Sequence, residues 1–131
     1  MRGAVRDLPV KDDGEMRVKC ATGGEKGIKM ARYDLIPMGA LHDLAEHYGK
    51  NSKTHGGKYE DRNWEKGLDW NLSFRSVIGH LTKFWEGEDL DPENDSKHVI
   101  AAAWHCLALA HFMDFYRAGD NRPSTTAEES K

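Results

Sequence analysis

Apolar residues recur at helical spacing in three segments of the chain. The first covers residues 37–49, where a proline suits the opening turn of a helix and a glycine can end it in a left-handed conformation. Its expected buried stripe is Leu41, Leu44, Ala45 and Tyr48, which fall on one face. This pattern predicts an amphipathic helix.

The second segment covers residues 71–86, and its apolar stripe leaves His80 on the flank, within reach of both the core and a ligand. The stripe consists of Phe74, Val77, Ile78, Leu81, Phe84 and Trp85. The third segment, residues 96–117, is apolar nearly all round, as expected of a helix that packs on several sides. No strong strand pattern follows Met30, so the sequence predicts an all-α fold, a small helical bundle of three main helices.

The N-terminal arm, residues 1–30, is polar and rich in glycine. Alternating apolar positions at Val18, Cys20, Ile28 and Met30 favour a short β-hairpin around a glycine-rich turn. Those glycines have neither dinucleotide-binding nor Walker spacing. We expect residues 31–117 to form a single helical domain. Residues 118–131 have almost no apolar content and are expected to be a disordered tail.

A long segment without clear periodicity joins the first two predicted helices, and loops of this length in a compact domain are uncommon unless they are functional or disordered. Its aromatic residues argue against disorder. Lys58 brings positive charge, Asn63 brings an amide that can read a base edge, and Tyr59 and Trp64 bring stacking faces. A tryptophan in a small domain is more often a core residue, so packing is the favoured interpretation of Trp64. The segment therefore suggests a phosphorylated, stackable ligand, and Arg32 with its neighbours upstream adds further positive charge.

Carboxylates fill most of residues 86–95, just before the third predicted helix. An EF-hand calcium loop is excluded, because Asn94 stands where glycine is needed and Ile100 where the bidentate glutamate belongs. Two interpretations stay open: a solvated loop favoured by the helix dipole, or a cation site formed by Glu88, Asp91 and Glu93. Oxygen ligands of this kind suit Mg²⁺ or Mn²⁺ shared with substrate phosphates.

Seven histidines invite a histidine–metal hypothesis. His98 is the most suggestive, since it follows the acidic loop at a helix start. His98 and His105 lie on one helix face but about 10 Å apart along the axis, too far to bind one metal together. We expect His42, His47 and His55 to be solvated.

Composition narrows the classes of function. A net charge of −3 argues against a uniformly basic face for duplex nucleic acid. The two cysteines, Cys20 and Cys106, form neither a disulfide framework nor a metal-ligand pair, which fits a reducing cytoplasm. The most apolar stretch, residues 99–116, is interrupted by histidines and an aspartate, so no membrane span is expected. The protein is expected to be soluble and cytoplasmic.

Several motifs resemble the bacteriophage family of dATP/dGTP diphosphohydrolases. The resemblance covers about 80 residues. It is carried by KMARYDLIP from Lys29, GGKYEDRNWEKG from Gly56, His80-Leu81, GEDLDPE from Gly87 and His98-Val99. It implies an all-α nucleotide-processing domain that uses a divalent metal to convert a deoxypurine triphosphate to its monophosphate and pyrophosphate, in the host cytoplasm.

Some positions depart from that family pattern. Gly79 stands where the family tends to have arginine, Ala101 where it tends to have a second histidine, and His105 where it tends to have asparagine. The ExxE and ExxD signature of other all-α nucleotide pyrophosphohydrolases is also missing, since Asp43 and Glu46 make only a DxxE.

The leading hypothesis is metal-dependent hydrolysis of a deoxynucleoside triphosphate, with His80 and His98 managing protons. The expected metal ligands are Glu88, Asp91 and Glu93. The expected nucleotide-binding residues are Lys29, Arg32, Lys58, Tyr59, Asn63 and Trp64. The alternative is a non-catalytic protein that sequesters a nucleotide or a host defence signal, and a third option is a structural or interaction module. A homo-oligomer is expected, because the third helix is apolar on more faces than two neighbours cover.

Overall fold

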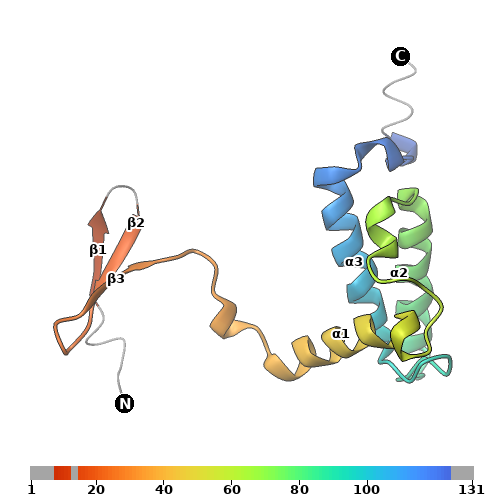
Figure 1. The fold of residues 1–131 in the computed structure, drawn as a ribbon, viewed down its shortest axis with the longest axis horizontal. Coiled ribbons are helices and arrows are strands. Elements are labelled where there is room, and N and C mark those ends of the chain that lie inside the picture. Colours follow the sequence, from red (N-terminus) through yellow and green to blue (C-terminus); the bar gives the residue numbers. More distant parts are fainter. Residues whose placement is uncertain (1–7, 13–14, 125–131) are drawn as a thin grey trace. The chain divides into compact units, whose positions relative to one another are not determined.

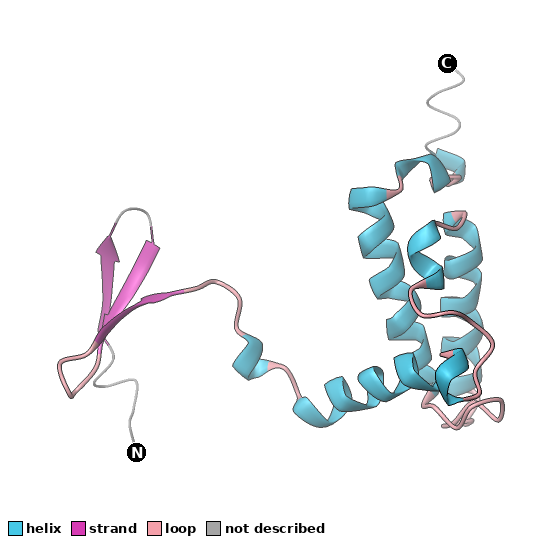
Figure 2. Cartoon of the chain, viewed as in Figure 1, coloured by secondary structure: helices cyan, strands magenta, loops and turns pink. Residues whose placement is uncertain are grey.

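The computed structural model describes residues 8–12 and 15–124 (Figure 1). The chain divides into two compact units, Met1–Pro37 and Met38–Lys131. The first unit holds the strands and the second holds the long helices, as Figure 2 shows by colour. Each unit is described by itself.

The first unit contains a three-stranded antiparallel sheet in the order β1-β2-β3. The strands are β1 (Leu8–Asp12), β2 (Glu15–Lys19) and β3 (Glu25–Ile28). The predicted hairpin is confirmed by the pairing of β2 with β3. Sequence analysis did not predict β1, which pairs with β2 and lies at an edge, where a proline such as Pro9 is tolerated.

The turn between β2 and β3 explains the glycine-rich string. Gly23 adopts a φ of 91°, which favours glycine, and its N–H donates to the Cys20 carbonyl at 2.9 Å. The Cys20 N–H donates in return to the Gly24 carbonyl at 2.7 Å. These glycines therefore make a hairpin turn, as expected.

The second unit is built on three helices, α1 (Met38–Lys50), α2 (Trp70–Trp85) and α3 (His98–Phe115). The predicted all-α bundle is confirmed, and each predicted helix begins and ends within about two residues of the observed one. Figure 1 shows α2 and α3 side by side, and these two helices form the main packing interface of the unit. They are antiparallel, because the start of α2 meets the end of α3. In particular, the Trp70 indole N–H donates to the Tyr116 carbonyl at 3.1 Å.

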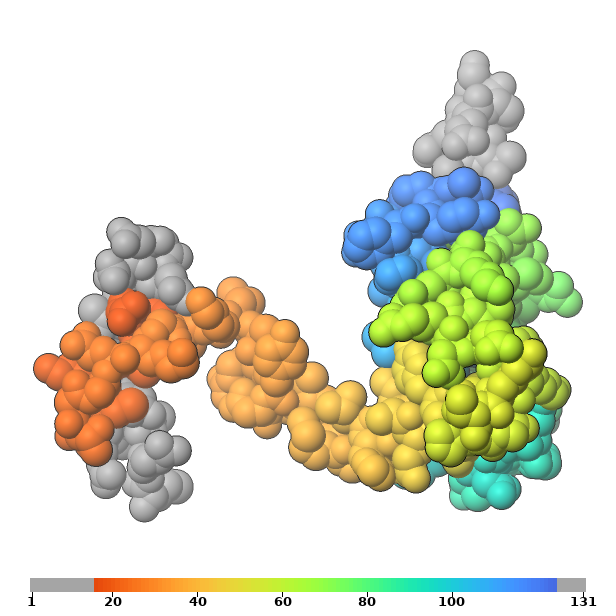
Figure 3. Space-filling view, viewed as in Figure 1, coloured from red at the N-terminus to blue at the C-terminus, as the bar shows by residue number. Residues whose placement is uncertain are grey.

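The main hydrophobic cluster lies at that end of the α2–α3 pair. The buried members of this cluster are Trp70, Ala108 and Phe112, with Trp64, Leu109 and Tyr116 packed against them. Ile100, Ala101 and Ala102, nearer the start of α3, are also buried. The segment between α1 and α2, yellow and yellow-green in Figure 3, covers part of the helical unit on the side in view. Trp64 fastens this segment to the core, which makes it at least partly the packing residue that one interpretation expected.

The predicted buried faces of α1 and α2 are wrong at most positions, although Leu44, Tyr48 and Val77 are half-buried. On α2 the stripe of Phe74, Ile78, Leu81 and Trp85 is exposed to solvent. The buried face of this helix instead runs through Trp70 and Ser73, with His80 partly buried on the same side. On α1, His47 is the only buried residue, while Leu41 and Ala45 are exposed. Periodicity identifies an apolar stripe but not what covers it.

Residues after α3 return to the start of α2. The Asn71 N–H at the start of α2 donates to the Asn121 side-chain oxygen at 3.0 Å, so Asn121 satisfies a helix N-terminus that its own N-cap residue leaves open. The Arg122 guanidinium lies 5.0 Å from the Trp70 ring centroid. Of the predicted tail over residues 118–131, the part beyond residue 124 lies outside the described residues.

Among the described residues, none of the helices combines the length and apolar content that a bilayer crossing requires.

Candidate metal and ligand site

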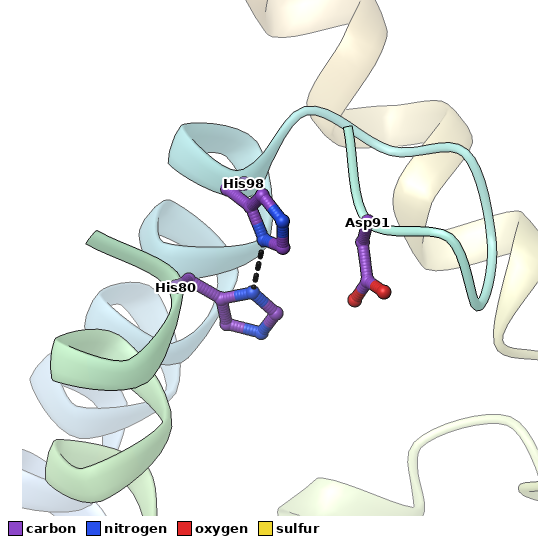
Figure 4. Close-up of side chains that lie close together, drawn as sticks. All are labelled: His80, Asp91 and His98. Atoms are coloured by element: carbon purple, nitrogen blue, oxygen red, sulfur yellow. Dashed lines mark hydrogen bonds between the residues drawn. The ribbon is translucent and has the colours of Figure 1, made fainter. Parts of the chain in front are cut away.

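Two histidines and an aspartate from three different elements converge at the end of the α2–α3 pair opposite the core. His80 lies near the end of α2, His98 begins α3, and Asp91 comes from the acidic loop between them. One ligand atom from each lies within 4.8 Å of the other two. Figure 4 shows the two imidazole rings with their Nδ1 atoms facing one another, and Asp91 pointing toward the same space.

The backbone of the acidic loop brings Asp91 back beside His98. Leu90 and Lys97 form an antiparallel bridge, and the Asp91 N–H donates to the Ser96 carbonyl at 2.8 Å. Asp95 turns the chain with a φ of 59°, a left-handed conformation that Asp tolerates better than most residues. The loop is therefore a closed turn.

A second carboxylate orients His98. The Glu88 Oε2 lies 2.6 Å from His98 Nε2, so the imidazole carries its proton on Nε2 and donates it to that carboxylate. Nδ1 of His98 then keeps its lone pair and accepts the Nδ1–H of His80 at 2.9 Å, a proton whose place a metal ion would take. Carboxylates often orient metal-binding histidines in this way.

The separation of the two nitrogens fits a shared cation. For metal–nitrogen bonds of about 2.1 Å, two ligands at a right angle lie about 3.0 Å apart. His80 and His98 lie 2.9 Å apart, close to that spacing. Asp91 supplies a carboxylate oxygen, and its Oδ1 is oriented by the Glu93 N–H at 2.9 Å. The residues present therefore fit a divalent metal with two imidazole ligands and one carboxylate.

Burial lowers the pKa values of His80 and of a neighbouring histidine, His105. Burial lowers the pKa of His80, an effect that Asp91 opposes and His98 reinforces. The His105 ring stacks on His80 with centroids 5.9 Å apart, and burial, followed by the neighbouring His80 and His47, lowers the pKa of His105 to about 4. Neutral imidazoles are the form that binds metal. His105 Nδ1 is buried and has no hydrogen-bond partner.

His47 is a correction to the sequence analysis, which expected it to be solvated. It is 4% exposed, and burial lowers its pKa. Its Nε2 accepts from the Asn51 amide at 3.1 Å, and its Nδ1 then donates to the Ser96 hydroxyl at 2.7 Å. His47 therefore ties α1 to the acidic loop.

A pocket of about 670 Å³ lies beside the histidines. Its lining includes Tyr59, Asn63 and Trp64 from the long loop and Trp104 and His105 from α3. Because His105 lines the pocket and also stacks on His80, the pocket adjoins the candidate metal ligands. Its volume lies in the range of about 300–1,000 Å³ typical of small-molecule sites.

Comparison with known families identifies the chain. The model of a family described as dATP/dGTP diphosphohydrolase, N-terminal, matches residues 20–122. The chain belongs to this family. No match was found among curated proteins or among solved structures. The matched range contains the His80, Asp91 and His98 group and the residues that line the pocket.

The structure separates the expected metal ligands. Asp91 joins the two histidines, which sequence analysis expected to carry protons, whereas Glu88 contacts His98 from the far side of the ring. The Glu93 carboxylate instead pairs with the Lys58 ammonium at 2.5 Å. That ion pair connects the basic loop to the acidic loop.

The expected nucleotide-binding residues are divided between the two units. Tyr59, Asn63 and Trp64 line the pocket, as described. Lys29 follows β3 in the N-terminal unit. In the same unit the Arg32 guanidinium makes a bidentate pair with Asp34, with bonds of 2.9 and 2.8 Å. Sequence reasoning missed Trp104, whose position among apolar residues of a central helix resembles that of any core tryptophan.

Proposed function

We propose that this chain contributes a divalent-metal-dependent hydrolysis of a purine deoxynucleoside triphosphate, releasing the monophosphate and pyrophosphate. The observation that carries the proposal is the position of the His80, Asp91 and His98 group beside an aromatic pocket, within a family named for this activity. In the reaction, a water oxygen forms a bond to the α-phosphorus. At the same time the bond between the α-phosphorus and the oxygen that bridges it to the β-phosphorus breaks. Pyrophosphate leaves, and the water gives up a proton.

The donor set bears on which ion is bound. His80, His98 and Asp91 would hold the ion, which when bound would polarise phosphate oxygens and lower the pKa of coordinated water. Of the two ions expected from sequence, Mn²⁺ suits this set better, because imidazole ligands favour transition metals and Mg²⁺ prefers oxygen ligands throughout. Glu88 fixes the tautomer of His98 so that its Nδ1 lone pair faces the site.

The pocket residues supply recognition of the base. Tyr59, Trp64 and Trp104 offer aromatic faces on which a purine can stack, and the Asn63 side chain offers both a donor and an acceptor to a base edge. The Lys58 ammonium, largely exposed and paired with Glu93, is placed between the two loops where phosphate oxygens would compete for it. The pocket thus accounts for the base, and the histidine end for the phosphates.

The test is turnover measured together with binding. Purified protein is incubated with dGTP or dATP and Mn²⁺, at enzyme concentrations near that of the substrate, and the products are separated by chromatography. We expect the monophosphate and pyrophosphate. Asp91→Asn should lower kcat/KM by more than about 100-fold, since even groups behind the metal ligands contribute 10- to 100-fold.

Asp89→Asn is the matched control. It removes the same charge from the same loop, outside the group formed with the histidines, and should retain most activity. Equal losses of kcat/KM in Asp91→Asn and Asp89→Asn would assign the effect to the negative charge of the loop as a whole rather than to a metal ligand. Nucleotide that binds in calorimetry and is recovered intact would refute hydrolysis and support the sequestering alternative.

A further inference from the structure

One side of the α2–α3 pair is apolar and exposed. On α2 the exposed stripe consists of Phe74, Ile78, Leu81 and Trp85, at the i, i+4, i+7 and i+11 spacing of one helix face. Such a stripe normally faces a neighbour. Within the described residues it remains open to solvent.

A second exposed stripe runs along α3. It consists of Val99, Cys106, Ala110 and Met113, again on one face. Small side chains dominate its middle, with Cys106 and Ala110 one turn apart. The stripe on α3, called the α3 small-residue stripe below, is therefore less bulky than the stripe on α2, called the α2 ridge.

Both stripes lie on the same side of the helix pair. On α2 the side facing α3 is marked by His80, and on α3 the side facing α2 is marked by His98 and Phe112. In each helix the stripe is rotated about a quarter turn around the helix axis from the side that faces the other helix. The direction of this rotation is the same in both helices when each is viewed from its N-terminus. Because the helices are antiparallel, equal rotations bring the stripes to one face. Trp104 contacts α1 from the other side of α3.

The face is complementary to itself. No charged residue belongs to either stripe, and the charges that flank them differ in sign, with Arg75 beside the stripe on α2 and Asp114 beside the stripe on α3. Under a two-fold axis the α2 ridge of one copy meets the α3 small-residue stripe of the other, and the basic flank meets the acidic flank. An isologous interface requires this self-complementarity.

The exposed area is large enough for a dimer. Phe74 is 59% exposed and Trp85 is 86% exposed, which leaves about 300 Å² of these two residues in water if a large aromatic side chain presents 150–250 Å². A standard interface covers about 800 Å² per partner. Two aromatic side chains thus provide more than a third of it, before the other six residues are added.

We propose that this face, formed by the α2 ridge and the α3 small-residue stripe, binds a second copy of the chain. The helix pair of one copy then packs face to face on that of the other, with each α2 ridge against the α3 stripe of the partner copy. Side chains that are too exposed in one copy become the core of the dimer. The charged flanks set the orientation of the two copies.

The test compares two substitutions on α2 in the full-length chain. Ile78, 46% exposed, lies in the ridge, and Leu72, 45% exposed, lies on the opposite side of the same helix. Sedimentation equilibrium should show a dimer for the wild type and for Leu72→Glu. Ile78→Glu should raise the dissociation constant by about 1,000-fold, because a hot-spot loss of about 30-fold occurs twice in a symmetric interface. Circular dichroism confirms that each variant is folded, and Trp85→Glu provides a second ridge variant.

Alkylation of Cys106 distinguishes the occupant. Its exposed thiol should become protected as protein concentration rises, with Cys20 in the same digest as the internal reference for mass spectrometry. Ile78→Glu should abolish that dependence. A monomeric wild type overturns the proposal, whether or not Cys106 reacts freely. If Cys106 of a monomer is protected at all protein concentrations, another segment of the chain covers this face. Equal effects of Leu72→Glu and Ile78→Glu on the dissociation constant overturn it as well.

Discussion

Acidification should destabilise this protein through the buried histidine beside the candidate metal ligands. Burial lowers the pKa of His105 from its ordinary value of 6.5 to about 4. Between those two values the unfolded chain binds a proton that the folded chain does not bind, so the free energy of unfolding falls as the pH falls. The full difference corresponds to about 3 kcal/mol. By pH 4.5 about 2 kcal/mol of it should be lost relative to pH 7.

The pH range between 7 and 4.5 separates the effect of His105 on stability from the titration of carboxylates. Hydrogen bonds to arginine lower the pKa of Asp34 and of Asp120, so their contributions to stability are lost only below the ordinary carboxyl range. Burial also lowers the pKa values of His47 and His80, and these act in the same window as His105. A variant is therefore needed to assign the share of His105.

The assay is urea unfolding followed by circular dichroism from pH 7 to pH 4.5, with a chelator present and the protein concentration fixed. His105→Asn should lose about 2 kcal/mol less than the wild type over this range, whatever its stability at pH 7. His42→Asn makes the same substitution at an exposed histidine of α1 and serves as the matched control for the chemical change itself. The reasoning fails if the slopes of His105→Asn and the wild type coincide.

Three further substitutions test separate parts of the structure. Glu88→Gln should weaken Mn²⁺ binding about 10- to 100-fold in calorimetry, because it loses the charged partner of His98, whereas equal affinity would exclude that orienting role. Phe112→Ala should lower the free energy of unfolding by about 3–5 kcal/mol, since the ring is 0% exposed; a loss under about 1 kcal/mol in urea unfolding would contradict its place in the core. Gly79→Ala should raise the unfolding free energy by about 0.5–1 kcal/mol, because this glycine is inside α2 and an added Cβ meets no atom within 4 Å; lower stability would show a hidden constraint.

The helices were predictable because their signals are local. Pro37 precedes α1, and runs of apolar residues at 3.6-residue spacing mark α2 and α3. The left-handed end expected at Gly49 is wrong, because this glycine lies inside α1, which continues to Lys50. The burial of those runs depends on neighbours that no local pattern names. For that reason the ridge that includes Phe74 and Trp85 was predicted as core and lies in solvent.

The candidate site was only partly predictable for a related reason. The acidic run predicted Asp91 as a metal ligand. The place of His98 at a helix start, just after that run, predicted a functional role for this histidine. Asp91 faces the histidines and Glu93 does not, because of how the loop closes. That closure depends on the left-handed conformation of Asp95. His47 on α1 contacts Ser96 of the acidic loop, 49 residues later in the sequence. Helical periodicity does not predict such a contact.

The positions of the core and the site explain each other. Trp70 and Phe112 hold one end of the α2–α3 pair together by apolar packing, while His80 and His98 meet at the other end. Ten residues of helix separate Trp70 from His80, a rise of about 15 Å. At the histidine end, hydrogen bonds join His80 to His98 and His98 to Glu88, while Ile100, Ala101 and Ala102 are buried close to His98 in sequence. An ion held there would cross-link the two helices, so ligand binding and local folding would share the same free energy. Here the sequence places polar groups where an all-apolar helix pair would have continued its core.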